Sequence, residues 1–274
     1  LSNGSLTTMV DNSGSGFISF ERDISVTRWR EDITANRWGY YLYLRDLDTG
    51  ELWSATYNPT QVEPELYSVV CKGDKVEFLR RDNQILSLLE ITVAQEDNVD
   101  VRRITLTNLS DRKRNLEVTS FGEVALVNTR ADKAHPAFQR LFVESSFDEE
   151  HDALIFSRRP RSRHDSNLFL FHSVATRTVW DRLQYETSRP NFIGRGNSLG
   201  RPAALKVQQL TNTVGSVLDP AFSLRVRIEL EPAESHSLSF ATGTARSRET
   251  LHHLTTKYRD LHSITRAFEL AWSQ

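Results

Sequence analysis

The stretch Leu224-Arg225-Val226-Arg227-Ile228-Glu229-Leu230 alternates apolar and charged side chains along its whole length. A period of two places successive side chains on opposite faces of an extended chain, so the stretch predicts a β-strand with one buried and one solvated face. Pro232 to Ser235 supply a turn, and Leu238 and Phe240 begin a return strand with the same alternation. The stretch therefore indicates an antiparallel β protein.

The same pattern recurs along the chain. Segments 40–44, 86–93, 104–107, 116–118 and 168–174 have the composition and period of strands. Polar turn sequences separate such segments: Asp48-Thr49-Gly50, Lys72-Gly73-Asp74 and Asp82-Asn83. Many strands joined by short polar turns are typical of antiparallel sheets packed face to face, not of βαβ units.

The period changes near the C-terminus, where residues 246–274 have helical spacing. The apolar stripe consists of Leu251, Leu254, Tyr258, Leu261, Ile264, Phe268 and Trp272. Ser247 predicts a helix N-terminus, and residues 260–263 predict an interruption that gives two helices. We therefore expect a β domain over residues 1–245 and a helical segment over residues 246–274.

Composition excludes several classes of partner. Charged residues make up 26% of the chain and the net charge is −2, so nucleic acid is not expected as a partner. The lone Cys71 excludes an internal disulfide and favours a reducing compartment. No apolar run approaches the length of a membrane span, so no membrane contact is expected. Because Leu1 replaces an initiator Met, we expect a domain of a longer chain.

No catalytic or metal motif stands out. The chain has no G-x-S-x-G sequence and no phosphate-binding glycine loop. The adjacent His252 and His253 point to different sides of a helix and do not share a metal easily, so neither a metal nor a cofactor is expected. Carboxylate pairs such as those in glycoside chemistry occur in charged, turn-like surroundings, which indicates a solvated surface. They are Glu31 with Asp32, Glu63 with Glu65, and Glu149 with Glu150.

The first candidate binding cluster contains Trp29, Arg30 and Trp38. The apolar face of a sugar ring stacks on an aromatic ring, and its hydroxyls need donors and acceptors. The cluster therefore predicts a sugar-binding surface. The alternative is that Trp29 and Trp38 anchor the core or an interface.

A second cluster is centred on Glu123, which lies in an apolar strand segment. An unpaired carboxylate would be costly there, so a partner such as Arg or His is expected. His135, in Ala134-His135-Pro136-Ala137-Phe138, is one candidate. The two residues are either a structural pair or an acid and base pair.

A third cluster is the segment 188–202, which has three glycines, two prolines and three arginines. We expect a loop, too long for a plain hairpin turn. Phe192, Arg195 and Arg201 on such a loop are candidates to reach a neighbouring domain. The arginines would hold hydroxyls or phosphate, or form salt bridges.

These clusters also carry a resemblance that runs along nearly the whole chain. The sequence resembles the β-sandwich domain of glycoside hydrolase family 94, formerly grouped as glycosyltransferase family 36, and within it the cyclic β-1,2-glucan synthases. The resemblance rests on the order of the strings 1–4, 26–32, 43–46, 53–55, 134–138, 192–196 and 212–220.

The resemblance implies a galactose-mutarotase-like supersandwich, followed by a helical linker toward an (α/α)6 catalytic barrel. In the family that barrel supplies the general acid, so the resemblance implies a non-catalytic accessory domain. It further implies a β-glucan oligosaccharide as ligand, with Arg195 as the best candidate to reach the sugar. Partners would be the barrel of the same chain and a second copy in a homodimer. The location would be cytoplasmic, with the parent anchored in the bacterial inner membrane.

Two alternatives come from other functional classes. The domain would be a purely structural packing or dimerisation module if its aromatic residues never touch sugar. It would be a stand-alone mutarotase-like enzyme if an acid and a base converge on one sugar. Glu123 with His135 is the only pair that we would test for that role.

Overall fold

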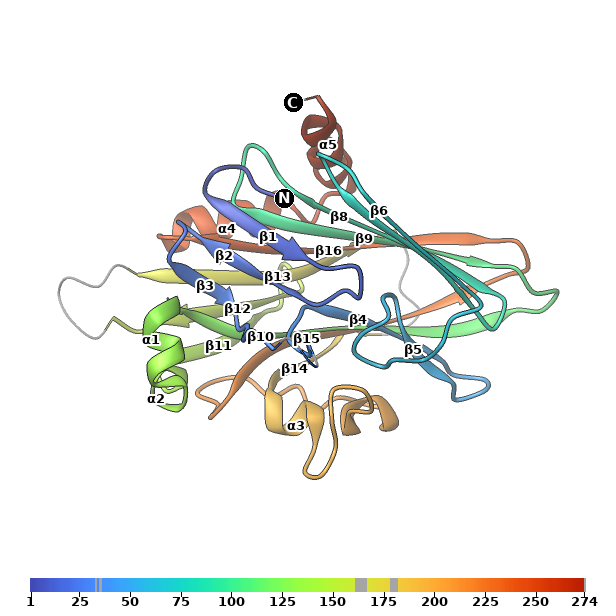
Figure 1. Cartoon of the computed structure of the whole chain (residues 1–274), viewed down its shortest axis with the longest axis horizontal. Helices are drawn as coiled ribbons and strands as arrows, with labels where there is room; N and C mark the ends of the chain where they lie inside the picture. The colour runs from blue at the N-terminus through green and yellow to red at the C-terminus, as the bar shows by residue number, and fades with distance from the viewer. Residues whose placement is uncertain (33, 35, 161–166, 178–181, 274) are drawn as a thin grey trace.

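The computed structural model describes residues 1–32, 34, 36–160, 167–177 and 182–273. Within them, antiparallel strands form two eight-stranded sheets that pack face to face (Figure 1). The predicted all-β supersandwich is therefore confirmed. Residue 274, the last of the predicted helical segment, lies outside the described residues.

The first sheet has the order β1-β2-β3-β10-β15-β14, with β4 and β5 continuing it beside β10. Its strands are β1 (Leu6–Val10), β2 (Gly16–Phe20), β3 (Ile24–Thr27), β4 (Tyr41–Asp46), β5 (Leu52–Ser54), β10 (Arg114–Asn128), β14 (Gln184–Ser188) and β15 (Pro220–Leu230). Strand β10 is long enough to pair with β3 along one half and with β4 along the other.

The second sheet has the order β11-β12-β13-β16-β9-β8-β7-β6. Its strands are β6 (Leu66–Cys71), β7 (Val76–Asp82), β8 (Ile85–Val93), β9 (Val99–Asn108), β11 (Val143–Asp148), β12 (Ala153–Arg158), β13 (Leu168–Thr176) and β16 (Ser235–Ala245). Strand β6 is the exposed edge of this sheet.

Short helices connect and cover the sheets. They are α1 (Thr129–Ala134), α2 (Pro136–Arg140), α3 (Arg189–Ile193), the 3-10 helix η1 (Ala203–Lys206), α4 (Arg248–Lys257) and α5 (Leu261–Trp272). Figure 1 shows α3 and α5 on opposite sides of the sandwich. None of the helices in the described residues is long and apolar enough to cross a membrane.

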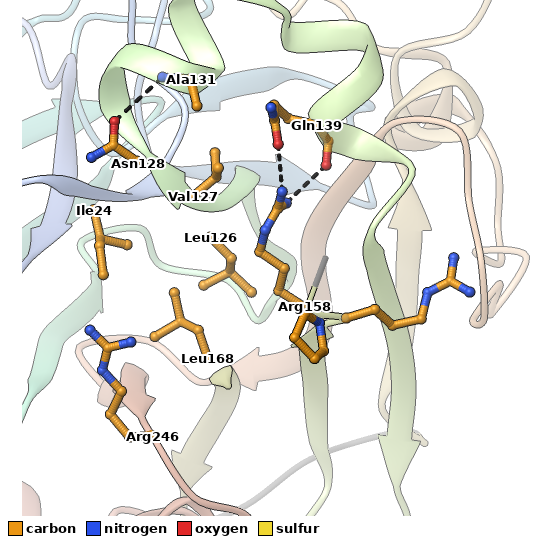
Figure 2. A pocket seen from close by; sticks show the side chains of 11 residues that line it. Ile24, Leu126, Val127, Asn128, Ala131, Gln139, Arg158, Leu168 and Arg246 are labelled. Atoms are coloured by element: carbon orange, nitrogen blue, oxygen red, sulfur yellow. Dashed lines mark hydrogen bonds between the residues drawn. The ribbon is translucent and has the colours of Figure 1, made fainter. Parts of the chain in front are cut away.

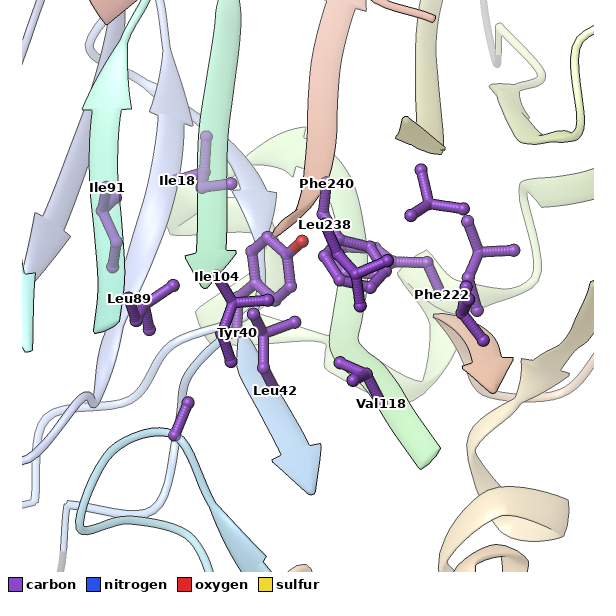
Figure 3. Close-up of a cluster of buried hydrophobic side chains, with 14 of the residues drawn as sticks. Ile18, Tyr40, Leu42, Leu89, Ile91, Ile104, Val118, Phe222, Leu238 and Phe240 are labelled. Carbon is purple, nitrogen blue, oxygen red and sulfur yellow. The ribbon is translucent and has the colours of Figure 1, made fainter. Parts of the chain in front are cut away.

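The main core lies between the sheets and contains the inward side chains of both. Figure 3 shows Tyr40, Phe222 and Phe240 at its centre, with Ile104 and Val118 nearby. The Tyr40 and Phe222 rings meet edge to face with centroids 5.0 Å apart, an arrangement that aromatic pairs favour. This burial holds the two sheets together.

The strand pattern of the sequence is confirmed, but one predicted pairing is wrong. Leu224 to Leu230 lie in β15, whereas Leu238 and Phe240 lie in β16 of the other sheet. The turn at 231–234 therefore crosses between sheets instead of closing a hairpin. The connection from β9 to β10 also passes from one sheet to the other. Asn108, at the end of β9, donates from its side chain to the Leu230 and Glu231 carbonyls and so joins the two connections. A local alternation cannot distinguish these two connections.

The outer face of β15 is also less solvated than predicted. Arg225 is only 1% exposed, because the segment around η1 covers it. Its guanidinium donates to the carbonyl oxygens of Ala204 and Val207 and pairs with Glu117 at 3.1 Å. A buried arginine with a carboxylate partner and carbonyl acceptors is tolerated in the interior.

The C-terminal segment agrees with the predicted two helices. Ser247 caps α4 and Asp260 caps α5, each accepting hydrogen bonds from backbone N–H groups of the first turn. The apolar stripe packs on the outer face of the second sheet in a cluster with Phe169 and Phe171. Trp272 departs from the stripe, because its side chain is 76% exposed.

Candidate functional site

The geometry of the site begins with a gap in the pairing of β10. Strand β3 ends with Thr27 opposite Val124, and β4 begins with Tyr41 opposite Phe121. The chain therefore leaves the sheet after Thr27, beside Gly122 and Glu123, and the Arg28 N–H donates to the Glu123 carbonyl at 2.9 Å. The first sequence cluster is thus placed directly over the second.

The other side of β10 brings in the third cluster. Glu123 pairs with Ala221 of β15, and Pro220 pairs with Ser188 at the end of β14. The segment that follows β14 therefore starts next to Glu123. Gly122 is required at this crossing because a Cβ there would lie 2.3 Å from the Phe222 ring.

The segment 188–202 is folded more tightly than the predicted loop. Its first part forms α3, which Ser188 caps and which Gly194 ends at a φ of 79°. Phe192 is fully buried and stacks on Phe121 with ring centroids 4.4 Å apart. The Tyr43 hydroxyl donates to the Leu199 carbonyl at 2.8 Å, which holds the far end of the segment.

Glu123 lies in an ion-pair network that joins the three clusters. One oxygen accepts from Arg189 at 2.5 Å, and the other lies 3.4 Å from the buried Arg28 guanidinium. Arg28 also reaches Asp132 and Asp219, each at 3.3 Å. The Arg28 side chain is 1% exposed and Glu123 4%, so water screens this pair weakly.

Further arginines surround the same carboxylates. Arg30 pairs with Asp132 at 2.5 Å, and Arg140 of α2 pairs with Asp219 at 2.8 Å. Burial, together with the positive charge of Arg28, lowers the pKa of Arg140. The network therefore holds β3, α1, α2 and α3 around β10.

A cavity of about 250 Å³ opens above this network. Its polar wall contains Asp32, Arg37, Glu123, Arg189, Asn197 and Ser198, and its apolar wall contains Trp38, Ile193 and Leu199. The half-buried indole ring of Trp38 can pack on the apolar face of a sugar ring. The carboxylate, guanidinium and amide groups of the polar wall can hydrogen-bond to the sugar hydroxyls.

A second cavity of about 260 Å³ adjoins the first, because Arg37, Ser198 and Leu199 line both. Its remaining wall is polar and includes Asn58, Gln61 and the exposed Arg201. Together the two cavities fall in the size range of small-molecule sites, roughly 300–1,000 Å³. The surface is suited to a ligand longer than one ring.

The structure brings only one of the predicted aromatic residues to this cavity. Trp38 lines it, whereas Trp29 packs its half-buried ring against Phe17, with centroids 5.4 Å apart. Arg30 is held against Asp132 and lines neither cavity. Sugar contact at Trp29 and Arg30 stays a prediction, and Trp29 matches the anchor alternative better.

Two predicted residues of the third cluster have opposite surroundings. The Phe192 ring is 0% exposed, so it has no free face for a sugar, and we do not carry that prediction forward. Arg195 is exposed on the loop but lines neither of the two cavities. Its predicted contact with a sugar therefore remains a prediction.

The pairing of Glu123 with His135 is not formed. Both oxygens of Glu123 are engaged by Arg189 and Arg28, as the expectation of an arginine partner allowed. His135 is exposed at the start of α2, and among the described residues no contact joins it to Glu123. The acid and base interpretation of this pair therefore has no contact to support it and stays a prediction.

Another cavity, of about 370 Å³, lies elsewhere, between the ends of β10, β12 and β13. Figure 2 shows Leu126 and Leu168 facing its centre and Arg158 turned toward Gln139 of α2. Arg158 donates to the Gln139 carbonyl at 2.9 Å, and Arg246 pairs with Glu21. These guanidiniums serve internal contacts, so we favour the cavity at Trp38 as the site.

Sequence reasoning missed most of the cavity wall, including the three polar residues Asp32, Arg37 and Asn197. All three stand in the clusters that the sequence singled out, but their neighbours were chosen instead. A signal was present for Asp32, because it follows Trp29 closely and a carboxylate accepts hydrogen bonds from sugar hydroxyls. Which of them line the cavity depends on how the described residues of both segments are placed beside β10.

The fold defines the chain as a β-supersandwich domain. Residues 1–261 match the family model described as glycosyl hydrolase 94, supersandwich domain. The chain therefore belongs to the glycosyl hydrolase 94 family, in which it is the supersandwich domain.

The chain spans less than a third of the length of the relatives that it matches. Along its whole length it is 33% identical to a cyclic beta-(1,2)-glucan synthase of Rhizobium meliloti, of which it spans 10%. It is 25% identical over 80% of its length to a 3-O-beta-D-glucopyranosyl-beta-D-glucuronide phosphorylase of Paenibacillus borealis, of which it spans 27%. Among solved structures, a bacterial glucoamylase complexed with acarbose is similar in fold, with a TM-score of 0.53 and 8% identity over 99% of this chain and 34% of that chain.

Proposed function

We propose that this domain presents a non-catalytic, carbohydrate-binding wall to a β-1,2-glucan within a larger glucan-processing enzyme. The observation that carries the proposal is the cavity that Trp38 lines together with Asp32, Arg37 and Asn197. The similarity to a cyclic beta-(1,2)-glucan synthase supports a β-1,2-linked glucose chain as the ligand.

The chemistry of the cavity supports binding without catalysis. Glu123 is the buried carboxylate at its base, and two arginines neutralise it. A general acid must present a proton to the leaving group, whereas both oxygens of this carboxylate face arginine guanidiniums. Asp32 is exposed and accepts from the Thr34 N–H and hydroxyl, so it is a polar ligand on an open rim.

The partners follow from the lengths of the relatives. Because the chain spans a tenth of the glucan synthase that it resembles, we propose that a catalytic (α/α)6 barrel of the same chain completes the sugar cleft. The free, exposed Cys71 fits a reducing compartment, so we place this domain on the cytoplasmic side of the membrane of the parent.

Calorimetric titration of the 274-residue chain with linear β-1,2-gluco-oligosaccharides tests the proposal, with cello-oligosaccharides as the ligand control. We expect selective binding, weakened roughly tenfold, or by about 1.4 kcal/mol, in Trp38→Ala. The matched control is Trp272→Ala, because Trp272 is 76% exposed and lies on α5, on the opposite side of the sandwich from α3 (Figure 1). No binding at millimolar ligand, or equal losses in the two variants, would reject a site at Trp38.

A second candidate function is packing against another domain or another copy. Leu218 is 78% exposed, and its neighbour Asp219 pairs with Arg140, the last residue of α2. Phe138 of α2 and Leu141, which follows the helix, are about half exposed. Contiguous exposed apolar side chains are typical of protein interfaces. Sedimentation of the chain measures this: a dimer that Leu218→Asp dissociates favours the packing function, and a monomer at high concentration rejects dimerisation through this patch.

A further inference from the structure

The turn between β11 and β12 brings two possible metal ligands to a third on α4. The donor atoms of Glu150, His151 and His252 all lie within 4.8 Å of one another. The His151 and His252 rings meet edge to face with centroids 4.7 Å apart. His252 and its neighbour His253 do not share a face, but the fold supplies His151 from about a hundred residues away.

His151 is already oriented as a metal-binding histidine. Its Nδ1 lies 2.8 Å from an Asp148 carboxylate oxygen, which accepts the ring proton. The other Asp148 oxygen accepts from the N–H groups of Glu150 and His151, so the carboxylate itself is fixed. A carboxylate on one ring nitrogen leaves the lone pair on the other and raises its basicity, as in carboxylate–histidine–zinc arrangements.

The lone pair of His151 points toward α4. Its Nε2 lies 3.0 Å from the Thr256 hydroxyl, which stands one helical turn after His252 and also bonds to the His252 carbonyl. That hydroxyl is exposed and can rotate away. His151 itself is buried, at 6% exposure, so its ring cannot leave the site.

The local charge favours a cation. Asp148, Glu150 and Asp152 lie on the turn, and among the described residues only Arg259 opposes them, through the Glu150 carbonyl and Asp152. No partner for the Glu150 carboxylate is present in the described part of the chain. The carboxylate is therefore available as a ligand.

We propose that Glu150, His151 and His252 bind a divalent transition metal of the zinc class, with water completing a tetrahedral set. Two imidazoles and a carboxylate are a zinc donor set, and bonds of about 2.0–2.1 Å require donor atoms about 3.4 Å apart. Rotation of the two exposed side chains, Glu150 and His252, closes the remaining distance. The ion would join the β11–β12 turn to α4 and so fasten the C-terminal helices to the sandwich.

Titration of the metal-free chain with zinc against a chromogenic chelator tests this proposal. We expect one zinc per chain, with affinity at least tenfold lower in His252→Ala and lower in Glu150→Gln. The matched control is His253→Ala, since His253 is also exposed on the same helix. The zinc affinity of this variant should stay within twofold of that of the unsubstituted 274-residue chain. Cobalt bound in place of zinc should show the intense visible absorption of tetrahedral coordination.

Thermal stability provides a second readout, and the variants that it compares change only exposed residues. Zinc should raise the Tm of the parent chain and of Thr256→Ala, which frees the His151 lone pair, but not the Tm of His252→Ala. Absence of one-to-one binding in the parent chain would overturn the proposal. Equal zinc affinity in His252→Ala and His253→Ala, or an unchanged affinity in Glu150→Gln, would overturn it as well.

Discussion

The Arg189 guanidinium donates to the Glu123 carboxylate at 2.5 Å, and this ion pair ties the segment after β14 to the centre of β10. The same carboxylate faces the buried Arg28 on its other side. Two parts of the chain that are distant in sequence therefore meet over one acidic residue. The candidate cavity at Trp38 exists because this contact holds its two walls together.

Replacement of Glu123 by Gln should destabilise the fold. The change leaves Arg28 buried with less compensating charge, and breaking a buried ion pair from one side costs on the order of 3 kcal/mol. Urea unfolding followed by fluorescence measures the loss. Glu31→Gln is the control, because Glu31 is exposed, and its midpoint should not move. A Glu123→Gln midpoint equal to that of the control would contradict the structural role of the pair.

Trp29 and Trp38 should respond to truncation in opposite ways. Trp29→Ala removes a ring that packs on Phe17, so we expect a loss of about 2 kcal/mol in unfolding free energy, less than the 3–5 kcal/mol of a fully buried ring. Its affinity for oligosaccharide should be unchanged. Trp38→Ala should lose affinity with little change in stability. Both quantities are measured on each variant, and a loss of affinity confined to Trp29→Ala would reverse the assignment.

His172 should make the stability depend on pH. Its ring is fully buried, and burial lowers its pKa to about 3, whereas an unfolded histidine titrates near about 6.5. Between these values the unfolded chain binds more protons, so the contribution is fully present above pH ~6.5 and is lost as the pH falls toward 3. The slope is up to about 1.4 kcal/mol per pH unit.

Urea unfolding at several pH values between about 4 and about 7 measures this contribution, because most of the interval between the two pKa values falls in that range. His172→Gln removes the titrating group, so its unfolding free energy should vary less with pH than that of the parent chain. The exposed His253→Gln should keep the slope of the parent. Parallel pH profiles for the parent and His172→Gln would exclude His172 as the source.

The C-terminal helices should be part of the stable domain and not only a linker. Leu251, Leu254 and Phe268 are buried against the outer face of the second sheet. A chain that ends at residue 245 exposes this face, so we expect its unfolding free energy to fall by more than about 3 kcal/mol. A chain that ends at residue 260 keeps α4 and should be intermediate. If the chain that ends at residue 245 keeps the Tm of the 274-residue chain, residues 1–245 are an independent unit.

Part of the site was predictable from the sequence, and the reason is local chemistry. The composition of segments 27–41 and 188–202 marks them as ligand-binding candidates, and an arginine partner for Glu123 follows from the cost of a buried charge. The individual ligands did not follow. Trp29 and Phe192 pack inward, whereas Asp32 and Asn197 face the cavity, because each loop's path depends on contacts with distant strands.

The sequence by itself determined the strand segments and the two C-terminal helices, including the cap at Ser247, because period and capping act over a few neighbouring residues. Only the tertiary structure decided that β15 and β16 belong to different sheets and that η1 buries Arg225. It also brought Trp38 over Glu123 and His252 to His151. Such contacts depend on which strands pair across long separations in the chain, and a local pattern carries no information about that choice.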